Sequence, residues 1–144
     1  MTTVQHVLDK KGHLVWTIDA NESVFHALEQ MALKDIGVLA VTENETLVGM
    51  FSERVYARNV ILKGRSSPTT PVRDVMRTDV ICARPDQTVD ECMAIMTEKR
   101  VRYLPVLQEG KPIGIVSIGD LVKSIIGRQE VTIKQLTSYI GGTG

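Results

Sequence analysis

The feature that most constrains this chain of 144 residues is an internal repeat. When the sequence is shifted by 65 positions without a gap, identical residues recur from the first copy to the second. From residue 15 to residue 61 the identical pairs are Val15 with Val80, Val24 with Val89, Met31 with Met96, Lys34 with Lys99, Leu39 with Leu104, Val41 with Val106, Gly49 with Gly114, Ser52 with Ser117 and Ile61 with Ile126. A unit of this size buries little surface by itself, so the two copies are expected to pack against each other.

Each copy predicts the same order of elements, β-α-β-β-α. A short β-prone run comes first, then a helix whose apolar residues recur at helical spacing, then two strands with a tight turn between them, and then a second helix. The predicted ranges in the two copies are 15–18 and 80–83 for the first strand, 38–42 and 104–107 for the second, 47–51 and 113–116 for the third, and 53–62 and 118–126 for the closing helix. The predicted fold class is therefore α+β, with two pseudo-symmetric repeats packed as one pair.

The composition of residues 64–71, rich in Ser, Thr and Pro, favours a linker between the copies. The first repeat, with an N-terminal lead-in, then occupies residues 1–63, and the second occupies residues 72–128. Residues 71–76, which lead into the second repeat, are similar to the lead-in at residues 3–8. The tail, residues 129–144, has apolar residues at helical spacing and is expected to form a further helix.

Charge and hydropathy exclude several classes of function. Seventeen basic residues balance seventeen acidic ones, so no overall positive field favours nucleic acid as a partner. The longest apolar runs are far shorter than the roughly 20 residues that cross a bilayer, so no membrane association is expected. The first residues lack a basic start followed by an apolar stretch, and we therefore expect a cytoplasmic protein.

The sequence shows no pattern typical of an enzyme or of a metal site. The three histidines, His6, His13 and His26, precede the motif region and accompany no recognisable nucleophile. There is no C-x-x-C and no H-E-x-x-H pattern. We predict no catalytic residues and no metal.

The run Gly114-Ile115-Val116-Ser117-Ile118-Gly119-Asp120, together with the repeat, resembles the tandem CBS (cystathionine-beta-synthase) domain family, whose motif is a Gly, two apolar residues, Ser or Thr, two variable residues and Asp. Residues 84–88, 102–106 and 72–76 add weaker similarities in the expected order, and the resemblance spans nearly the whole chain. It implies two clefts between the repeats, adenine nucleotides as ligands, and a homodimer.

The resemblance also implies which residues form the main site. Asp120 is expected to accept hydrogen bonds from the ribose hydroxyls, and Ser117 with the amides of Ile118 and Gly119 to bind phosphate at a helix start. The expected adenine slot and the arginines that neutralise phosphate are Ile81, Cys82, Ala83, Tyr103, Leu104, Pro105, Arg102, Arg54 and Arg58. A solvated helix face explains Arg54 and Arg58 equally well, and a helix-start carboxylate is the alternative role for Asp120.

The first copy departs from the motif, because Val55 stands where a ribose carboxylate is expected. A valine side chain cannot hydrogen-bond a diol, so the two sites are unequal. The second, weaker site is expected to comprise Thr17, Ile18, Val38, Leu39 and Ser52.

The predicted function is that of a regulatory sensor that binds an adenosine nucleotide between the repeats and signals to an unidentified effector protein. AMP or NAD(H) is the expected ligand, ahead of ATP, ADP and S-adenosylmethionine. Because no G-x-G-x-x-G run follows a predicted strand, dinucleotide binding of the Rossmann type is not expected. The alternative function is a protein-interaction or dimerisation module whose nucleotide clefts are vestigial.

Overall fold

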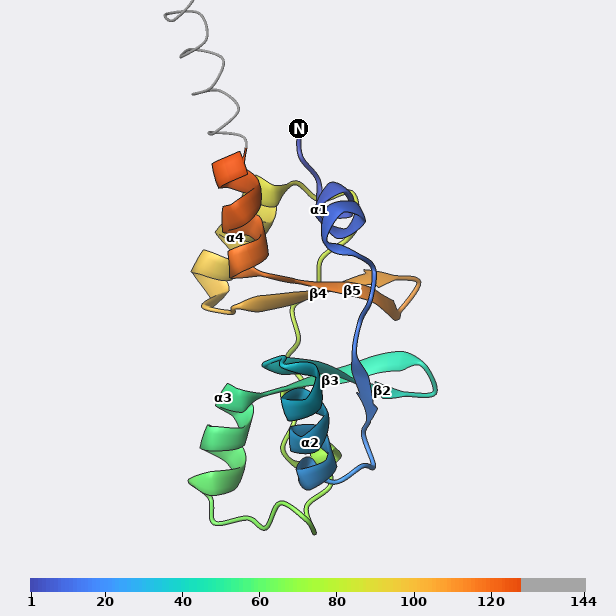
Figure 1. Ribbon diagram of the computed structural model, residues 1–144, viewed down its shortest axis with the longest axis vertical. Helices are drawn as coiled ribbons and strands as arrows, with labels where there is room; N and C mark the ends of the chain where they lie inside the picture. The colour runs from blue at the N-terminus through green and yellow to red at the C-terminus, as the bar shows by residue number, and fades with distance from the viewer. Residues whose placement is uncertain (128–144) are drawn as a thin grey trace, which may run out of the picture.

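The computed structural model describes residues 1–127, in which two small sheets face each other across the middle of the molecule and helices cover their outer faces (Figure 1). Residues 128–144, which include the predicted tail helix, lie outside the described residues. The helices and strands are α1 (Val4–Lys11), β1 (Thr17–Asp19), α2 (Val24–Lys34), β2 (Val38–Glu43), β3 (Thr46–Ser52), α3 (Glu53–Tyr56) with the π-helix Ala57–Ile61 that continues it, the 3-10 helix Val72–Asp74, α4 (Val89–Lys99), β4 (Tyr103–Gln108) and β5 (Lys111–Ser117), followed by helical residues 118–127.

The sheets follow the order that the repeat predicts. In the first copy β1 pairs parallel with β2, and β2 pairs antiparallel with β3. In the second copy β4 and β5 form an antiparallel pair. The two-residue turns of these hairpins have left-handed backbone at both positions, Asn44-Glu45 and Glu109-Gly110, which matches the twist of the flanking strands. The α+β class with two repeats is confirmed.

The alternation of side chains along β2 places apolar groups on both faces of the first sheet. Leu39 and Val41 point into the core beneath α2, whereas Val38 and Ala40 belong to a cluster between the sheets. Tyr103 and Ile115 reach the same cluster from the second sheet. The two copies are therefore joined by a narrow apolar layer between their separate cores.

The first strand predicted for the second copy, residues 80–83, is wrong. Only Ala83 pairs there, in a single parallel bridge with Val106. In the first copy the amide of Ala40 donates to the carbonyl of Trp16, 3.2 Å away, and extends the ladder. The equivalent of Ala40 is Pro105, which has no N–H to donate, so the ladder is shorter in the second copy.

The lead-in segment of each copy, residues 3–8 in the first and residues 71–76 in the second, packs against the core of the other copy. Helix α1 packs Val4, Val7 and Leu8 into the core of the second copy, while Val72 and Val75 enter the core of the first. Matching backbone hydrogen bonds anchor both segments. They are Val4 to Gln87, Gln5 to Pro85 and Val89 to Thr2 for the first lead-in, and Val72 to Glu22, Arg73 to Ala20 and Val24 to Thr70 for the second.

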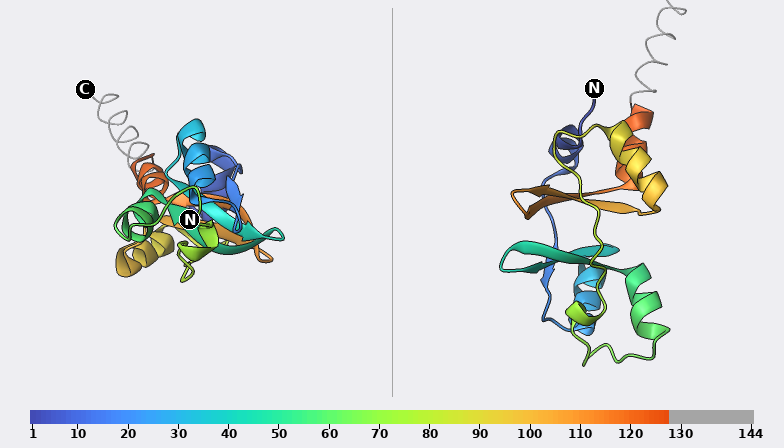
Figure 2. Two further views of the ribbon diagram at one scale, coloured as in Figure 1. Left: turned by 90° about the horizontal axis from the view of Figure 1, so that it is seen from below. Right: turned by 180° about the vertical axis from the view of Figure 1, so that it is seen from behind.

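This exchange makes the chain cross twice between the copies, as the two long connections in the rear view show (Figure 2). The division of the chain into segments that the composition predicts stays a prediction, but the two repeats are interlocked in space. Within residues 1–127 no helix is long and apolar enough to cross a membrane.

The crossing segments pack tightly against two glycines of the repeat, Gly49 and Gly114. A Cβ added at Gly49 meets the Met76 Sδ atom at 2.6 Å and the backbone oxygen of Arg77 at 2.9 Å. We expect Gly49→Ala to destabilise the fold by about 1–3 kcal/mol, because the neighbouring backbone cannot move without breaking its pairing with β3. Urea unfolding measures this difference.

The matched control is Gly119→Ala, since a Cβ at Gly119 meets only the Ser117 Oγ atom, at 3.6 Å. Gly119 is helical, so this change should leave stability unchanged or raise it by up to about 1 kcal/mol. Equal effects of the two substitutions would contradict the close approach at Gly49.

Candidate functional site

A cavity of about 570 Å³ opens between the two copies. Its walls come from the end of β3 and the start of α3 in the first copy and from the segment before β4 in the second copy. A further wall comes from residues 77–81, the second segment that crosses between the copies. The lining residues are Gly37, Val38, Met50, Ser52, Glu53, Arg54, Val55, Arg58, Arg77, Asp79, Val80, Ile81, Arg100, Val101, Arg102 and Tyr103.

One side of the cavity is apolar and aromatic. Val38, Met50, Val80 and Tyr103 line it and also belong to the apolar layer between the sheets. The Tyr103 hydroxyl lies 3.2 Å from the place where a Cβ of Gly37 would stand. A glycine at position 37 therefore lets the Tyr103 ring cross from the second copy onto the first.

The second crossing segment forms another wall, because it is tied to the edge of the first sheet. Met50 and Arg77 exchange two backbone hydrogen bonds of 2.9 Å. Further along, Ile81 is the equivalent of Trp16, whose carbonyl accepts from the Ala40 amide, but Pro105 has no N–H to donate. Within the described residues the Ile81 carbonyl accepts no hydrogen bond. An unsatisfied carbonyl at the cavity wall is a ready acceptor for a ligand N–H group.

The rim of the cavity is strongly basic. Five arginines line it against two carboxylates, Glu53 and Asp79. Arg77 is already paired with Asp79 through contacts of 2.9 and 3.4 Å. In the described part of the chain the other four, Arg54, Arg58, Arg100 and Arg102, form no ion pair with a carboxylate. Guanidinium groups gathered in this way suit an anionic ligand such as phosphate.

The structure brings seven of the residues named from the sequence into this cavity. They are Val38, Ser52, Arg54, Arg58, Ile81, Arg102 and Tyr103. Seven of the others do not line it: Thr17, Ile18, Leu39, Cys82, Ala83, Leu104 and Pro105. Ile18, Leu39, Ala83 and Leu104 belong to the two cores, and both backbone groups of Ala83 are bonded to Pro105 and Leu107.

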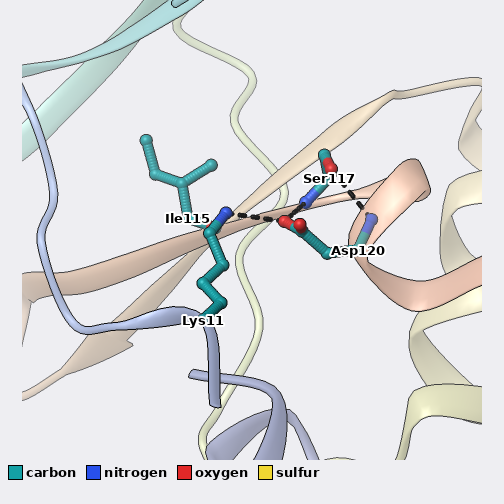
Figure 3. A network of polar contacts seen from close by, with 4 residues as sticks. All are labelled: Lys11, Ile115, Ser117 and Asp120. Carbon is teal, nitrogen blue, oxygen red and sulfur yellow. Dashed lines mark hydrogen bonds and ion pairs between the residues drawn. The ribbon is translucent and has the colours of Figure 1, made fainter. Parts of the chain in front are cut away.

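Four further predicted residues, Ser117, Ile118, Gly119 and Asp120, lie apart from the cavity lining, at the start of the last described helix. The Asp120 Oδ2 atom accepts hydrogen bonds from the Ser117 amide at 2.8 Å and from the Lys11 Nζ atom at 2.6 Å. In return the Asp120 amide donates to Ser117 Oγ at 3.0 Å, and Lys11 also donates to the Ile115 carbonyl at 2.8 Å. Figure 3 shows Lys11 reaching Asp120 from the end of α1.

This network is a reciprocal helix cap with an added ion pair, so the Asp120 carboxylate is engaged by Lys11 and Ser117. Burial raises the pKa of Asp120, but the hydrogen bonds from Lys11 and Ser117 and the attraction of the ammonium outweigh it and hold that pKa below its ordinary value of 3.8. At the equivalent place in the first copy only the Ser52 hydroxyl caps the helix, by accepting from the Val55 amide at 3.1 Å.

Sequence reasoning did not name Lys11, Arg77, Arg100, Glu53 or Asp79. Arg77 and Lys11 reach their sites through the exchange of lead-ins, which leaves no local pattern in the sequence. Arg100 follows the last turn of α4, where a left-handed backbone (φ 55°) turns the chain toward β4. Among residues 1–127 no group of three or more His, Cys, Asp or Glu side chains is arranged to hold a metal ion.

The Lys11–Asp120 contact generates a pH-dependent prediction. Lys11→Met should lower the free energy of unfolding at neutral pH by about 1 kcal/mol, the scale of a charge-assisted hydrogen bond on a partly exposed group. Because the folded pKa of Asp120 is depressed, the stabilisation is present above the unfolded pKa and is lost as the pH falls through the folded pKa. Urea midpoints measured from neutral to acidic pH should therefore converge for the two proteins in acid.

The control is Arg84→Met, since the Arg84–Asp86 pair is 69% and 79% exposed and should contribute almost nothing. A Lys11→Met effect that stays constant down to the lowest pH would show that the ion pair is not the cause, and would assign the effect to the hydrogen bond with the Ile115 carbonyl or to packing of the lysine stem.

Comparison with known proteins places this geometry in a family. Residues 4–58 and 72–127 each match the family model of the CBS domain. The Arabidopsis thaliana CBS domain-containing protein CBSX3, which is named as mitochondrial, is 33% identical over 151 aligned residues that cover 98% of this chain and 73% of the relative.

Two solved structures have the same fold. The crystal structure of the CBS domain NE2398 has a TM-score of 0.83 and 45% identity, and the match covers 87% of this chain and 98% of that chain. A Burkholderia ambifaria protein, provisionally named a signal-transduction protein with CBS domains, has a TM-score of 0.83 and 46% identity over 89% of this chain and 96% of that chain. The chain belongs to the CBS domain family and is a tandem CBS pair, a regulatory module of the signal-transduction type.

Proposed function

We propose that this CBS pair is a sensor that binds an adenosine nucleotide, AMP or NAD(H), in the cavity between the copies and passes the signal to a separate effector protein. The observation that carries the proposal is the two-sided character of the cavity. One part of its lining is apolar and aromatic, and the lining also holds four arginines that form no ion pair with a carboxylate in the described part of the chain. This combination suits a flat base joined to phosphate.

The apolar part of the lining can hold the base. Tyr103 and Val38 offer a ring and an apolar surface, and the open Ile81 carbonyl can accept a hydrogen bond from the adenine amino group. The arginines that line the cavity can then bind the phosphates, because each guanidinium group can donate two hydrogen bonds to phosphate oxygens. The ligand would then contact both copies at once.

The structure shifts our preference between the two clefts. Sequence reasoning expected the stronger site at Asp120, but that carboxylate is held by Lys11 and Ser117. The cavity on the Ser52 side offers open arginines instead. We therefore place the first ligand there, and a second nucleotide at Asp120 would have to displace Lys11.

Signalling follows from the position of the ligand. A nucleotide that bridges the copies favours the arrangement in which both walls fit it, and so shifts the population of states that a partner can recognise. We propose no catalysis, a cytoplasmic location, and no membrane or nucleic-acid partner.

A homodimer is part of the proposal, and exposed apolar side chains support it. Five such residues lie on the helical segments that end the two copies: Ile61, Leu62, Ile118, Val122 and Ile126. Their exposed fractions range from 39% to 77%. Both views show these segments on the same side of the molecule (Figures 1 and 2), so one continuous surface can cover a second copy.

Nucleotide binding is tested by calorimetric titration of nucleotide-stripped protein with AMP and with NADH. We expect micromolar affinity, and we expect Arg102→Ala to weaken it roughly tenfold, because one charge-assisted contact with phosphate is lost. Arg84→Ala is the matched control, since Arg84 lies outside the cavity lining. If no adenosine compound binds, the nucleotide sensor is excluded and the interaction module is favoured.

Self-association is tested by sedimentation velocity of the wild type and of the double variant Ile61→Glu/Val122→Glu. The wild type should sediment as a dimer and the variant as a monomer, because two carboxylates per copy would be buried in the interface. Leu33→Glu is the control, since Leu33 is 78% exposed on α2 and outside this surface. A monomeric wild type would contradict the proposed dimer.

A further inference from the structure

We propose that the cavity on the Ser52 side recognises adjacent phosphates and does not distinguish ribose from a sugar without hydroxyls. The inference rests on the proposed nucleotide function and deepens it. It ranks ligands with two or more linked phosphates, such as NAD(H), ADP and ATP, above AMP. Two features of this chain support it: what stands at the ribose position, and how the arginines are arranged.

The ribose position of this cavity carries no carboxylate. Val55 lines the cavity at the place that Asp120 occupies in the second copy. Its side chain has no polar atom, and its amide is already bonded to the Ser52 hydroxyl. A sugar diol placed there loses its hydration and gains no paired acceptor, so the hydroxyls contribute nothing to affinity.

The two carboxylates that do line the cavity are placed for other contacts. Asp79 holds the Arg77 guanidinium with both oxygens. Glu53 lies on the first turn of α3, and its Oε1 atom is 3.6 Å from the place where a Cβ of Gly37 would stand, so the carboxylate lies over the Gly37 backbone. We infer that neither is positioned to take the role that Asp120 has in the motif.

The arginines converge on the cavity from both copies. Arg54 and Arg58 are one helical turn apart and face it from the first copy, whereas Arg100 and Arg102 face it from the second. Four like charges around one cavity repel one another until an anion enters. Two or three linked phosphates can contact more of these guanidinium groups than a single phosphate can.

Arg100 also stands in a conformation that most residues avoid. Its φ of 55° is left-handed, and glycine is the residue favoured at such a helix end. The equivalent position in the first copy is Asp35, with φ 52°, and Asp35 does not line the cavity. An arginine kept at this backbone position, beside the cavity, is consistent with a role in binding.

The test is a calorimetric comparison of AMP, ADP, ATP, 2′,3′-dideoxy-ATP and inorganic tripolyphosphate at constant ionic strength, without divalent ions. We expect affinity to rise at least tenfold from AMP to ATP, as added phosphates meet added arginines. Dideoxy-ATP should bind within about twofold of ATP, and tripolyphosphate should compete with ATP. Equal affinities for AMP and ATP, or a tenfold loss with dideoxy-ATP, would overturn the proposal.

Two pairs of variants separate binding from folding. Arg100→Gly should raise the melting temperature, since it relieves the left-handed backbone, and yet weaken ATP more than AMP. Asp35→Gly should raise the melting temperature and leave ATP affinity unchanged. Val55→Asp, which copies the Ser117–Asp120 cap, should make the protein prefer ATP to dideoxy-ATP. The control Asp86→Asn, at an exposed carboxylate outside the cavity lining, should change neither affinity. A ribose preference in the wild type that disappears in Glu53→Gln would assign the diol to Glu53 and overturn the proposal.

Failure of this inference can be told apart from failure of the nucleotide function. If ATP binds but dideoxy-ATP binds much more weakly, the proposed nucleotide function is supported, and the inference that the cavity does not distinguish ribose is wrong. If tripolyphosphate binds and no adenosine compound does, the phosphate site stands and the nucleotide sensor falls. Absence of binding by every probe overturns both.

Discussion

The exchange of lead-in segments between the two copies is the constraint on which the rest of the structure depends. Val4, Val7 and Leu8 complete the core of the second copy, and Val72 and Val75 complete the core of the first. Neither copy can therefore unfold without exposing apolar groups of the other. The exchange also forces the chain to cross between the sheets, and one crossing supplies a wall of the cavity. Core packing and the candidate site thus have one structural cause.

Small departures from the repeat make the two clefts different. Pro105 replaces Ala40 and removes one ladder hydrogen bond, which leaves the Ile81 carbonyl open at the cavity wall. Val55 replaces Asp120, so the first copy keeps a helix cap but has no carboxylate at that place. The chemistry of the clefts is set by a few side chains and by one missing N–H group.

The repeat predicted the order of elements, because identical apolar spacing recurs at a fixed shift. The resemblance to the CBS family implied seven residues that line the cavity. The sequence did not predict which copy each lead-in completes, since both cores are equally apolar and spacing carries no information on exchange. The sequence therefore assigned Ile81 to the same predicted site as Asp120, whereas in the structure Ile81 lines the cavity together with Ser52 and Val55. Arg77 and Lys11 were missed for the same reason. The absence of a strand at residues 80–83 could have been predicted from Pro105. The repeat aligns Pro105 with Ala40, and a proline has no N–H to donate to the neighbouring strand.

The way in which the copies meet suits a module that responds to a ligand. The core of each copy is completed by the lead-in of the other copy, whereas among the described residues the layer between the sheets contains three buried residues, Val38, Ala40 and Met50. Apart from the lead-ins, the direct contact between the sheets is therefore small compared with the packing inside each core. Four arginines from the two copies line one cavity and form no ion pair with a carboxylate in the described part of the chain, so their like charges repel one another. An anion that neutralises them removes a repulsion and adds contacts to both copies in the same event. Its binding energy is then coupled to the arrangement of the copies, which is the property that a regulatory module requires.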